Sequence, residues 1–222
     1  MSVILKGVSK TFRANGVQTL VASDISAEFP AGRCVALLGR NGAGKSSLLQ
    51  MIAGVSQPDA GQIIRQGSVS WPVGFAGSFH GDLSGAENTR FVARIYGVDT
   101  DELVDYVADF SELGRQFNAP FRTYSSGMRS RLAFAVSMGV RFDTYLVDEV
   151  TAVGDARFRD KSEAVLQDRL ASSGAIVVSH SLQMLARICD MGAVLTGGRL
   201  HWHTNVMDAI DQHREIMGVS PV

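Results

Sequence analysis

Apolar and polar residues along the first part of the chain predict two strands, a third buried strand and a helix. The stretches "SVILKGVSKTF" and "QTLVASDISAEF" alternate apolar with polar residues, which is typical of half-buried strands, and Asn15-Gly16 between them favours an antiparallel turn. "CVALLG" is continuously apolar, as a fully buried strand is, and the helical pattern "KSSLLQMIAG" follows it after a glycine-rich turn.

The rest of the chain changes its pattern twice. Residues 84 to 140 are mostly helical in spacing, in "SGAENTRFVARIYG", "DELVDYVADF" and "TYSSGMRSRLAFAVSMGV". From residue 144 the buried strands "TYLVDE", "AIVVSH" and "GAVLTG" alternate with the helical stretches "RFRDKSEAVLQDRL" and "LQMLARIC", which predicts a parallel sheet. We expect one α/β domain over residues 1–222, with a core of residues 1–77 and 141–222 and a helical subdomain inserted at residues 78–140.

Composition and charge exclude several classes of protein. The 21 basic and 22 acidic side chains leave a formal charge of -1, so a dedicated nucleic-acid binder is not indicated. Cys34 and Cys189 belong to no CxxC pair, which argues against a zinc site or a disulfide framework and suggests two core residues. The chain has no apolar run long enough for a membrane span and no secretory signal at its start, so we expect a cytoplasmic protein.

The stretch "GRNGAGKSS" has the spacing of a phosphate-binding loop, with Gly39, four residues, then Gly44, Lys45 and Ser46. Its glycines let backbone N–H groups turn toward phosphate oxygens, Lys45 adds charge, and the Ser46 hydroxyl is a ligand for Mg²⁺. A buried strand before it and a helix after it are the context that this motif requires. The predicted ligand is a nucleoside triphosphate such as ATP.

Two further strands end in polar side chains. "TYLVDE" ends in Asp148, predicted to hold Mg²⁺, and Glu149, predicted to polarise the attacking water. "IVVSHS" presents His180 at the edge where ligands of open α/β sheets bind, where it could contact the γ-phosphate. A solvated strand end and a structural histidine are the alternatives.

The helix start at Ser125 and Ser126 has two interpretations. Both serines are suitable N-cap residues, and Gly127 lets the backbone come close to another group. By itself this stretch predicts a capped helix. Since the free N–H groups of a helix start also attract anions, phosphate binding is the alternative.

The phosphate-binding loop, this serine-rich helix start, the acidic strand and the strand-end histidine together resemble the ATP-binding cassette (ABC) ATPases, over nearly the whole chain. That resemblance implies a P-loop NTPase core with an N-terminal antiparallel β subdomain and an inserted helical subdomain. The family signature, usually Leu-Ser-Gly-Gly-Gln, falls on Tyr124-Ser125-Ser126-Gly127-Met128. Phe12 falls where the family stacks an aromatic ring on adenine, with a core phenylalanine as the alternative, and Asp155 falls in the loop that meets the opposite subunit, with a helix N-cap as the alternative.

The resemblance implies a full set of site residues. Glu149, His180 and Lys45 are the expected catalytic residues, and Ser46 and Asp148 the expected Mg²⁺ ligands. The expected nucleotide-binding residues are Phe12, Gly39, Arg40, Asn41, Gly42, Ala43, Gly44, Lys45, Ser46, Ser47, Tyr124, Ser125, Ser126, Gly127 and Asp155.

Two positions depart from the family pattern. The glutamine that relays ATP binding to the membrane subunit is absent between Gly67 and Arg115, so His80, Ser78 or a backbone group would replace it, and no residue is assigned. Met128 stands in place of the last signature residue.

These departures, with "VDEVTAVGDARF" and "SWPVGFAGSF", resemble the branch that exports bacterial polysaccharides, in particular the group 2 capsular polysaccharide exporters. The resemblance implies a homodimeric ATPase that acts with separate transmembrane permease subunits at the cytoplasmic face of the inner membrane. An O-antigen or teichoic acid exporter is the alternative, although several of those have a longer C-terminal part. A soluble ABC ATPase acting on nucleic acid or ribosomes and a P-loop kinase are the rivals from other classes, while His201 and His203 are interpreted as structural residues of an edge strand.

Overall fold

The computed structural model describes residues 2–14, 17–75, 77, 79–149 and 155–218. The chain divides into two compact units. The sheet unit contains Met1–Pro72, Phe142–Glu149 and Leu170–Val222, and the helical unit contains Val73–Arg141 and Val150–Arg169. Of the described residues, 155–169 therefore belong to the helical unit, although they were predicted to be part of the core.

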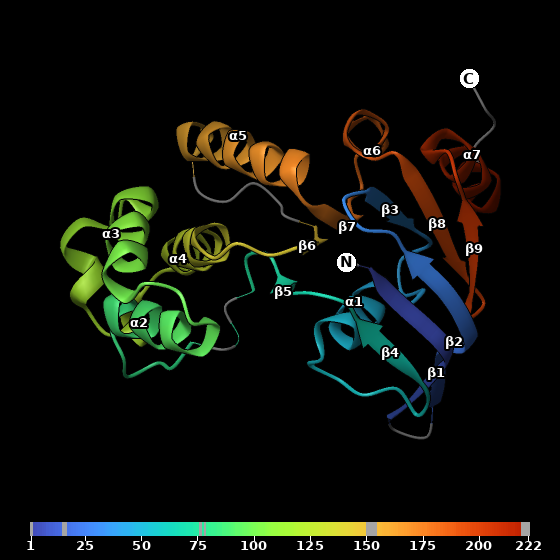
Figure 1. Cartoon of the computed structure of the whole chain (residues 1–222), viewed down its shortest axis with the longest axis horizontal. Coiled ribbons are helices and arrows are strands. Elements are labelled where there is room, and N and C mark those ends of the chain that lie inside the picture. The colour runs from blue at the N-terminus through green and yellow to red at the C-terminus, as the bar shows by residue number, and fades with distance from the viewer. Residues whose placement is uncertain (1, 15–16, 76, 78, 150–154, 219–222) are drawn as a thin grey trace. The chain divides into compact units, whose positions relative to one another are not determined.

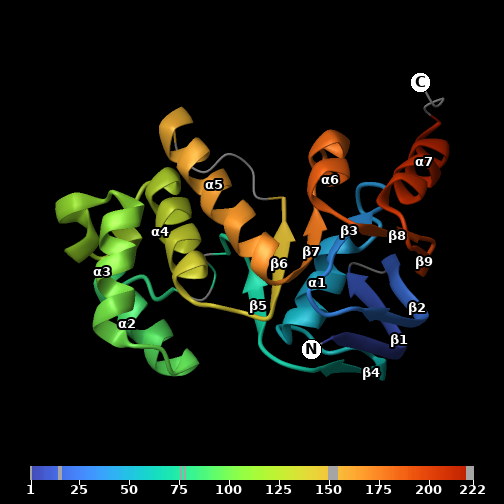
Figure 2. The same ribbon diagram turned by 45° about the horizontal axis from the view of Figure 1, so that its top comes forward.

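A six-stranded sheet runs through the sheet unit (Figures 1 and 2). Its order is β5-β6-β7-β3-β8-β9, and all neighbours are parallel except β9, which is antiparallel to β8 at the edge. The predicted parallel sheet and the predicted edge strand are thus confirmed. The strands are β3 (Cys34–Leu38), β5 (Val69–Pro72), β6 (Thr144–Asp148), β7 (Gly174–Val178), β8 (Met191–Thr196) and β9 (Arg199–His203).

A second, antiparallel sheet has the order β2-β1-β4. The predicted pair is confirmed as β1 (Val3–Ala14) and β2 (Val17–Phe29); the predicted turn residues Asn15 and Gly16 lie outside the described residues. Strand β4 (Ala60–Arg65) was not predicted, because only Ile63 and Ile64 in it are half-buried and the apolar pattern is too short to indicate a strand.

Three helices cover the six-stranded sheet. Helix α1 (Lys45–Ala53) packs between the two sheets and buries Leu48, Leu49, Met51 and Ile52 in the core that both sheets share. Helices α6 (Leu182–Ile188) and α7 (Val206–Met217) lie on the opposite side of the sheet from α1 in both views (Figures 1 and 2). The burial of apolar side chains on both faces explains why the inner strands β3, β6, β7 and β8 are mostly apolar.

The two cysteines lie side by side in this unit, which their separation in sequence did not indicate. Both are free and buried, and Cys34 Sγ lies 3.2 Å from Cys189 Sγ. Their hydrogen bond and their burial raise the pKa of the Cys189 thiol. The prediction that both are core residues is confirmed.

Helices make up the helical unit. Helix α2 begins with a capping box between Ser84 and Glu87, whose side chains bond each other's backbone N–H groups. The core of the unit contains the ring of Phe110, which packs against the rings of Phe134 and Phe158. The helices are α2 (Gly85–Tyr96), α3 (Thr100–Ser111), η1 (Gly114–Asn118), η2 (Phe121–Thr123), α4 (Ser126–Gly139) and α5 (Ala156–Ser172), whose last residues belong to the sheet unit.

Candidate functional site

The phosphate-binding loop joins the end of β3 to the start of α1. Gly39 has φ 151° and Gly44 has φ 101°, backbone conformations that residues with a side chain rarely adopt. A Cβ atom at Gly39 would collide with the carbonyl oxygen of Leu195, and one at Gly44 would come within 2.7 Å of Val21. The glycines at these positions therefore let the loop pack closely on β2 and β8 and bring it to the N-terminus of α1, where free N–H groups favour anions.

Lys45 is the first residue of α1, and its side chain bends back over the loop. The ammonium Nζ donates hydrogen bonds to the carbonyl oxygens of Gly39, at 2.8 Å, and Arg40, at 3.1 Å. Burial lowers the pKa of Lys45, while the nearby carboxylates of Glu149 and Asp148 act in the opposite direction. The lysine therefore lies between the loop and the carboxylates that end β6.

Glu149 follows the last residue of β6, Asp148. Its backbone has φ 45°, in the left-handed region, which for a residue with a side chain costs on the order of 1–3 kcal/mol. The Glu149 N–H bonds to the carbonyl oxygen of Val178 at 3.0 Å, which holds this conformation against β7. Strain of this kind concentrates at functional positions.

His180 lies two residues beyond the last residue of β7. Its Nε2 lies 2.9 Å from Oε1 of Glu149, so the ends of two neighbouring parallel strands bring these side chains together. Both side chains are partly exposed to solvent. A carboxylate and an imidazole in this arrangement can orient a water molecule or another polar group through hydrogen bonds.

A cavity of about 480 Å³ joins these features in the sheet unit. Phe12 lines it with a ring that is 40% exposed, so the alternative of a fully buried core residue does not apply. Thr19 and Val21 were not predicted to line this site, although the predicted turn at Asn15-Gly16 pairs Phe12 with Thr19, as the structure does. The lining residues are Phe12, Thr19, Val21, Asn41, Gly42, Gly44, Lys45, Ser46, Ser47, Glu149 and His180.

A second cavity, of about 290 Å³, shares Lys45, Glu149 and His180 with the first and is also lined by Gly39. Its far wall comes from α7, where His213 and Arg214 had no role in the sequence analysis. The Nδ1 atom of His213 is buried without a hydrogen-bond partner among the described residues. Burial lowers the pKa of His213, and the positive charge of Lys45 adds to this effect.

Within the loop, Arg40 and Ala43 complete the turn between the glycines. The Ala43 N–H donates to the carbonyl oxygen of Arg40 at 3.0 Å. This turn spaces the loop glycines around the position that the nucleotide phosphates are predicted to occupy.

The residues that match the signature all lie in the helical unit. Ser125 is the N-cap of α4, and its hydroxyl accepts a hydrogen bond from the Met128 N–H at 3.3 Å, so the capped helix is confirmed. Ser126 and Gly127 open the helix with exposed positions, and a Cβ at Gly127 would meet no atom within 4 Å. Open space at Gly127 is compatible with the close approach of a ligand.

Tyr124 differs from its neighbours because its side chain is buried, with only 4% exposed. Its hydroxyl donates to the carbonyl oxygen of Gln116 at 2.7 Å, and its own carbonyl oxygen accepts a hydrogen bond from Arg129 at 3.1 Å. Tyr124 therefore anchors the start of α4 to η1 within this unit.

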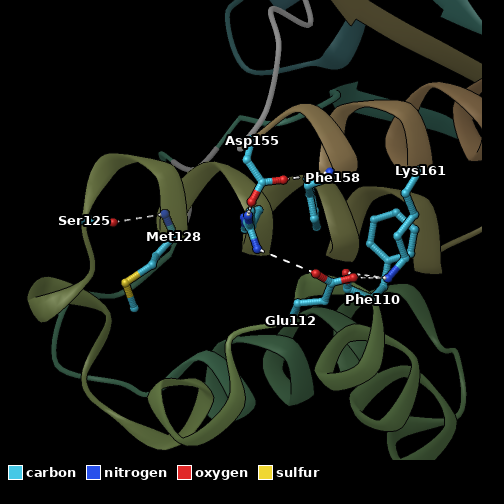
Figure 3. Close-up of polar contacts among 8 residues, drawn as sticks. Phe110, Glu112, Ser125, Met128, Asp155, Phe158 and Lys161 are labelled. Carbon is cyan, nitrogen blue, oxygen red and sulfur yellow. Dashed lines mark hydrogen bonds and ion pairs between the residues drawn. The ribbon is translucent and has the colours of Figure 1, made fainter.

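Asp155 caps the start of α5 (Figure 3). Its Oδ1 accepts a hydrogen bond from the Phe158 N–H at 3.0 Å, and its Oδ2 accepts one from Arg131 at 2.8 Å. The Phe158 N–H holds the pKa of Asp155 below its usual range, and the charge of Arg131 acts in the same direction. The N-cap interpretation is confirmed.

Three positions have no assigned role: His80 and Ser78, which are the candidates to replace the missing glutamine, and His203 of the edge strand. His80 fixes the segment that precedes α2. Its backbone N–H donates to Asn88 Oδ1 at 2.8 Å, and its ring nitrogen Nδ1 accepts a hydrogen bond from the Asp82 N–H at 3.3 Å. Ser78 lies outside the described residues. His203 shares a 2.7 Å hydrogen bond with Gln212 of α7, which fits the structural interpretation of the edge strand.

The metal-binding potential of the site depends on Ser46 and Asp148. Within the described ranges, no group of three or more His, Cys, Asp or Glu side chains is arranged to hold a metal ion. Mg²⁺ bound to nucleotide phosphates keeps several waters and takes only one or two protein ligands. A hydroxyl at the start of α1 and a carboxylate at the end of β6 therefore fit this ion.

Comparison with known proteins agrees with this geometry. The family model described as ABC transporter matches residues 22–152. The polysialic acid transport ATP-binding protein KpsT of Escherichia coli is 46% identical over 95% of both chains, and the capsule polysaccharide export ATP-binding protein CtrD of Neisseria meningitidis serogroup B is 42% identical over 96% of this chain and 99% of its own.

The fold agrees as well. The ATP-binding cassette MJ0796, in a dimeric post-hydrolysis structure bound to ADP and Pi, superposes with a TM-score of 0.75 at 19% identity, over 92% of this chain and 98% of the other. The family model, the relatives and the fold therefore lead to one conclusion. The chain belongs to the ABC transporter family and is one of its ATP-hydrolysing subunits.

Proposed function

We propose that this protein is the ATPase subunit that powers export of capsular polysaccharide across the bacterial inner membrane. The observation that carries the proposal is the cavity that joins the phosphate-binding loop to Glu149 and His180, in a chain 42–46% identical to capsule and polysialic acid transport ATP-binding proteins. Lipid-linked polymer is the substrate that the resemblance to group 2 exporters favours.

In this proposal ATP binds in the larger cavity. The adenine stacks on Phe12, and residues Gly39 to Ser47 hold the phosphates, with Lys45 leaving its carbonyl partners to contact the β- and γ-phosphates. Ser46 and Asp148 would hold Mg²⁺, which would supply positive charge to the phosphate oxygens during transfer.

Hydrolysis is assigned to the pair at the strand ends. Glu149 accepts a proton from the attacking water, because its carboxylate lies in the cavity next to Lys45. His180 orients Glu149 through the 2.9 Å contact and contacts the γ-phosphate. The attack produces ADP and inorganic phosphate.

The complete site requires two copies of the chain. The ATP held by one copy would face Ser125, Ser126 and Gly127 of the other copy. Asp155 of that other copy would lie at the same interface. Two-fold symmetry then gives two equivalent sites, and closing of the dimer on ATP drives the transport step. The opening of the dimer after hydrolysis resets it.

The membrane contact belongs to a separate transmembrane subunit. Among the residues that the structure describes, none of the helices combines the length and apolar character that a membrane crossing requires. Phe91 and Ile95, four residues apart on α2, are 54% and 59% exposed and form an apolar stripe. We place the contact with the transmembrane subunit on this stripe, at the cytoplasmic face of the inner membrane.

Deletion of the gene in its host tests the proposal. Capsule polymer should accumulate inside the cell and return to the surface when the gene is restored, but not when the Glu149→Gln variant is supplied. A normal capsule in the deletion strain would overturn the proposed substrate. Loss of surface O-antigen or teichoic acid in its place would assign the same ATPase to another polymer.

The stripe on α2 is tested separately. The variant with Phe91→Ser and Ile95→Ser should hydrolyse ATP in solution at the wild-type rate. It should no longer co-sediment with membranes that contain the permease. Retention on those membranes would place the contact elsewhere.

A further inference from the structure

Arg131, on α4, is held from three sides inside the helical unit. Its Nη2 donates to Oδ2 of Asp155 at 2.8 Å, its Nη1 lies 3.9 Å from Oε2 of Glu112, and its guanidinium carbon lies 4.5 Å from the centre of the Phe158 ring. The side chain is only 18% exposed. Arginine is the side chain suited to this place, because its planar fork binds carboxylates and stacks on aromatic rings at once.

The same helix carries the signature residues. α4 begins at Ser126 with Ser125 as its cap, so Ser125 and Arg131 lie less than two turns apart on one helix. Whatever Arg131 binds is therefore fixed relative to the signature residues.

Asp155 uses both carboxylate oxygens within its own chain. One oxygen caps α5 through the Phe158 N–H, as Figure 3 shows, and the other accepts a hydrogen bond from Arg131. Its side chain remains 68% exposed. The residue is thus anchored and still open to an outside partner.

A second cation in the same cluster provides an internal comparison. Lys161, on α5, donates to Glu112 at 3.0 Å and to the carbonyl oxygen of Phe110 at 3.2 Å, and it lies 4.6 Å from the centre of the Phe110 ring (Figure 3). Lys161 thus connects α5 to the end of α3, and Arg131 connects α4 to the end of α3 and to the start of α5. Among the described residues, no contact between Lys161 and Asp155 is found. Substitution of Lys161 therefore tests the effect of anchoring α5 in general, whereas substitution of Arg131 also removes the contact with Asp155.

We propose that Arg131 is a positioning residue that holds Asp155 in fixed geometry relative to Ser125–Gly127, so that both elements reach the partner's nucleotide together. This inference rests on the two-copy arrangement proposed above. Asp155 follows Glu149 by six residues in the sequence. Misplacement of such elements by about 1 Å costs roughly 100-fold in rate.

The test compares Arg131→Met with Lys161→Met. Arg131→Met should lower kcat for ATP roughly 10- to 100-fold and should weaken ATP-induced dimerisation of chains that also carry Glu149→Gln. The affinity of the single chain for a fluorescent ATP analogue should remain within about twofold of the wild type, because the loop at Lys45 is untouched. Lys161→Met should lower the midpoint of urea unfolding while kcat stays within about threefold of the wild type.

A double-mutant cycle shows whether Arg131 acts through Asp155. Asp155→Asn keeps a capping oxygen for α5 and loses the charge that pairs with Arg131. In that background Arg131→Met should change kcat by less than about twofold, because the contact is already lost. Arg131→Lys, which keeps the charge without the fork, should restore part of kcat.

Three results would overturn the inference: a wild-type kcat in Arg131→Met, equal losses of kcat in Arg131→Met and Lys161→Met, or the same loss from Arg131→Met with and without Asp155→Asn. If Arg131→Met does not fold, Arg131→Lys and Asp155→Asn must show the same separation of kcat from nucleotide affinity, or the inference is wrong. Failure of the wild type to hydrolyse ATP or to dimerise with it would count against the proposed function instead.

Discussion

The imidazole Nε2 of His180 lies 2.9 Å from Oε1 of Glu149. The two residues are 31 positions apart in the sequence and meet because β6 and β7 are parallel neighbours that end at the same edge of the sheet. Glu149 reaches this position through a left-handed backbone conformation that its hydrogen bond to Val178 supports. The pair faces the phosphate-binding loop across the larger cavity, and the predictions that follow depend on that placement.

Glu149→Gln should retain ATP binding and lose turnover by roughly 10²- to 10⁴-fold, because an amide does not accept the proton of the attacking water. Release of inorganic phosphate measures turnover, and equilibrium binding of a fluorescent ATP analogue measures affinity. Near-normal hydrolysis in this variant would remove Glu149 from the role of base.

Lys45→Ala should weaken ATP binding by roughly 10- to 100-fold, which is the loss expected for a charge-assisted hydrogen bond. The lysine bonds only to carbonyl oxygens of its own loop among the contacts found, so the fold should be kept. Titration with the ATP analogue measures the affinity, and circular dichroism checks the fold. Unchanged affinity would contradict the assignment of the loop.

Phe12→Ala should weaken binding of ATP by about 1–3 kcal/mol, the range found for a base stacked on an aromatic ring. Binding of inorganic triphosphate, which has no base, should not change. Phe12→Trp is the matched control and should keep the ATP affinity. Equal losses for ATP and triphosphate would show that Phe12 supports the loop rather than the adenine.

Gly39→Ala should destabilise the chain by at least about 2 kcal/mol, because the backbone lies at φ 151° and the new Cβ collides with the Leu195 carbonyl oxygen. Gly32→Ala is the control: its φ is also positive, at 64°, but a Cβ there meets no atom within 4 Å, so the cost should be about 1 kcal/mol. Urea unfolding measures both. Equal costs would mean that the contact with β8 does not constrain the loop.

The carboxylates of Asp155 and Glu112 should stabilise the fold at neutral pH and lose this effect in acid. Hydrogen bonds from the Phe158 N–H and from Lys161, respectively, lower the pKa values of these groups below their usual range. A lowered native pKa contributes stability above the unfolded pKa, about 3.9 to 4.3, and this contribution is lost as the pH falls through the native value. The difference in urea midpoint between the wild type and Glu112→Gln should therefore be present at pH 7 and shrink below about pH 4. A difference that is constant with pH would contradict it.

Local sequence patterns predicted the elements whose signals are contiguous. The run from Cys34 to Ile52 contains a strand, a loop and a helix, and its glycine spacing is a signal that is read within one short stretch of sequence. The continuously apolar strands β6 and β7 were predicted for the same reason, because burial on both faces requires apolar residues throughout. The strand β4 was missed since its pairing with β1, rather than its own pattern, makes it a strand.

The sequence by itself determined the chemistry of this protein: a phosphate-binding loop, two carboxylates and a histidine at strand ends, and a capped helix with the family signature. Only the tertiary structure decided which of these meet, because the partners of Glu149, Lys45 and Arg131 come from strands and helices that are distant in the sequence. It placed His180 against Glu149, His213 near Lys45, and Arg131 against Asp155. A side chain's type is read from one position, whereas its neighbours depend on sheet order and helix packing, which depend on contacts along the whole chain.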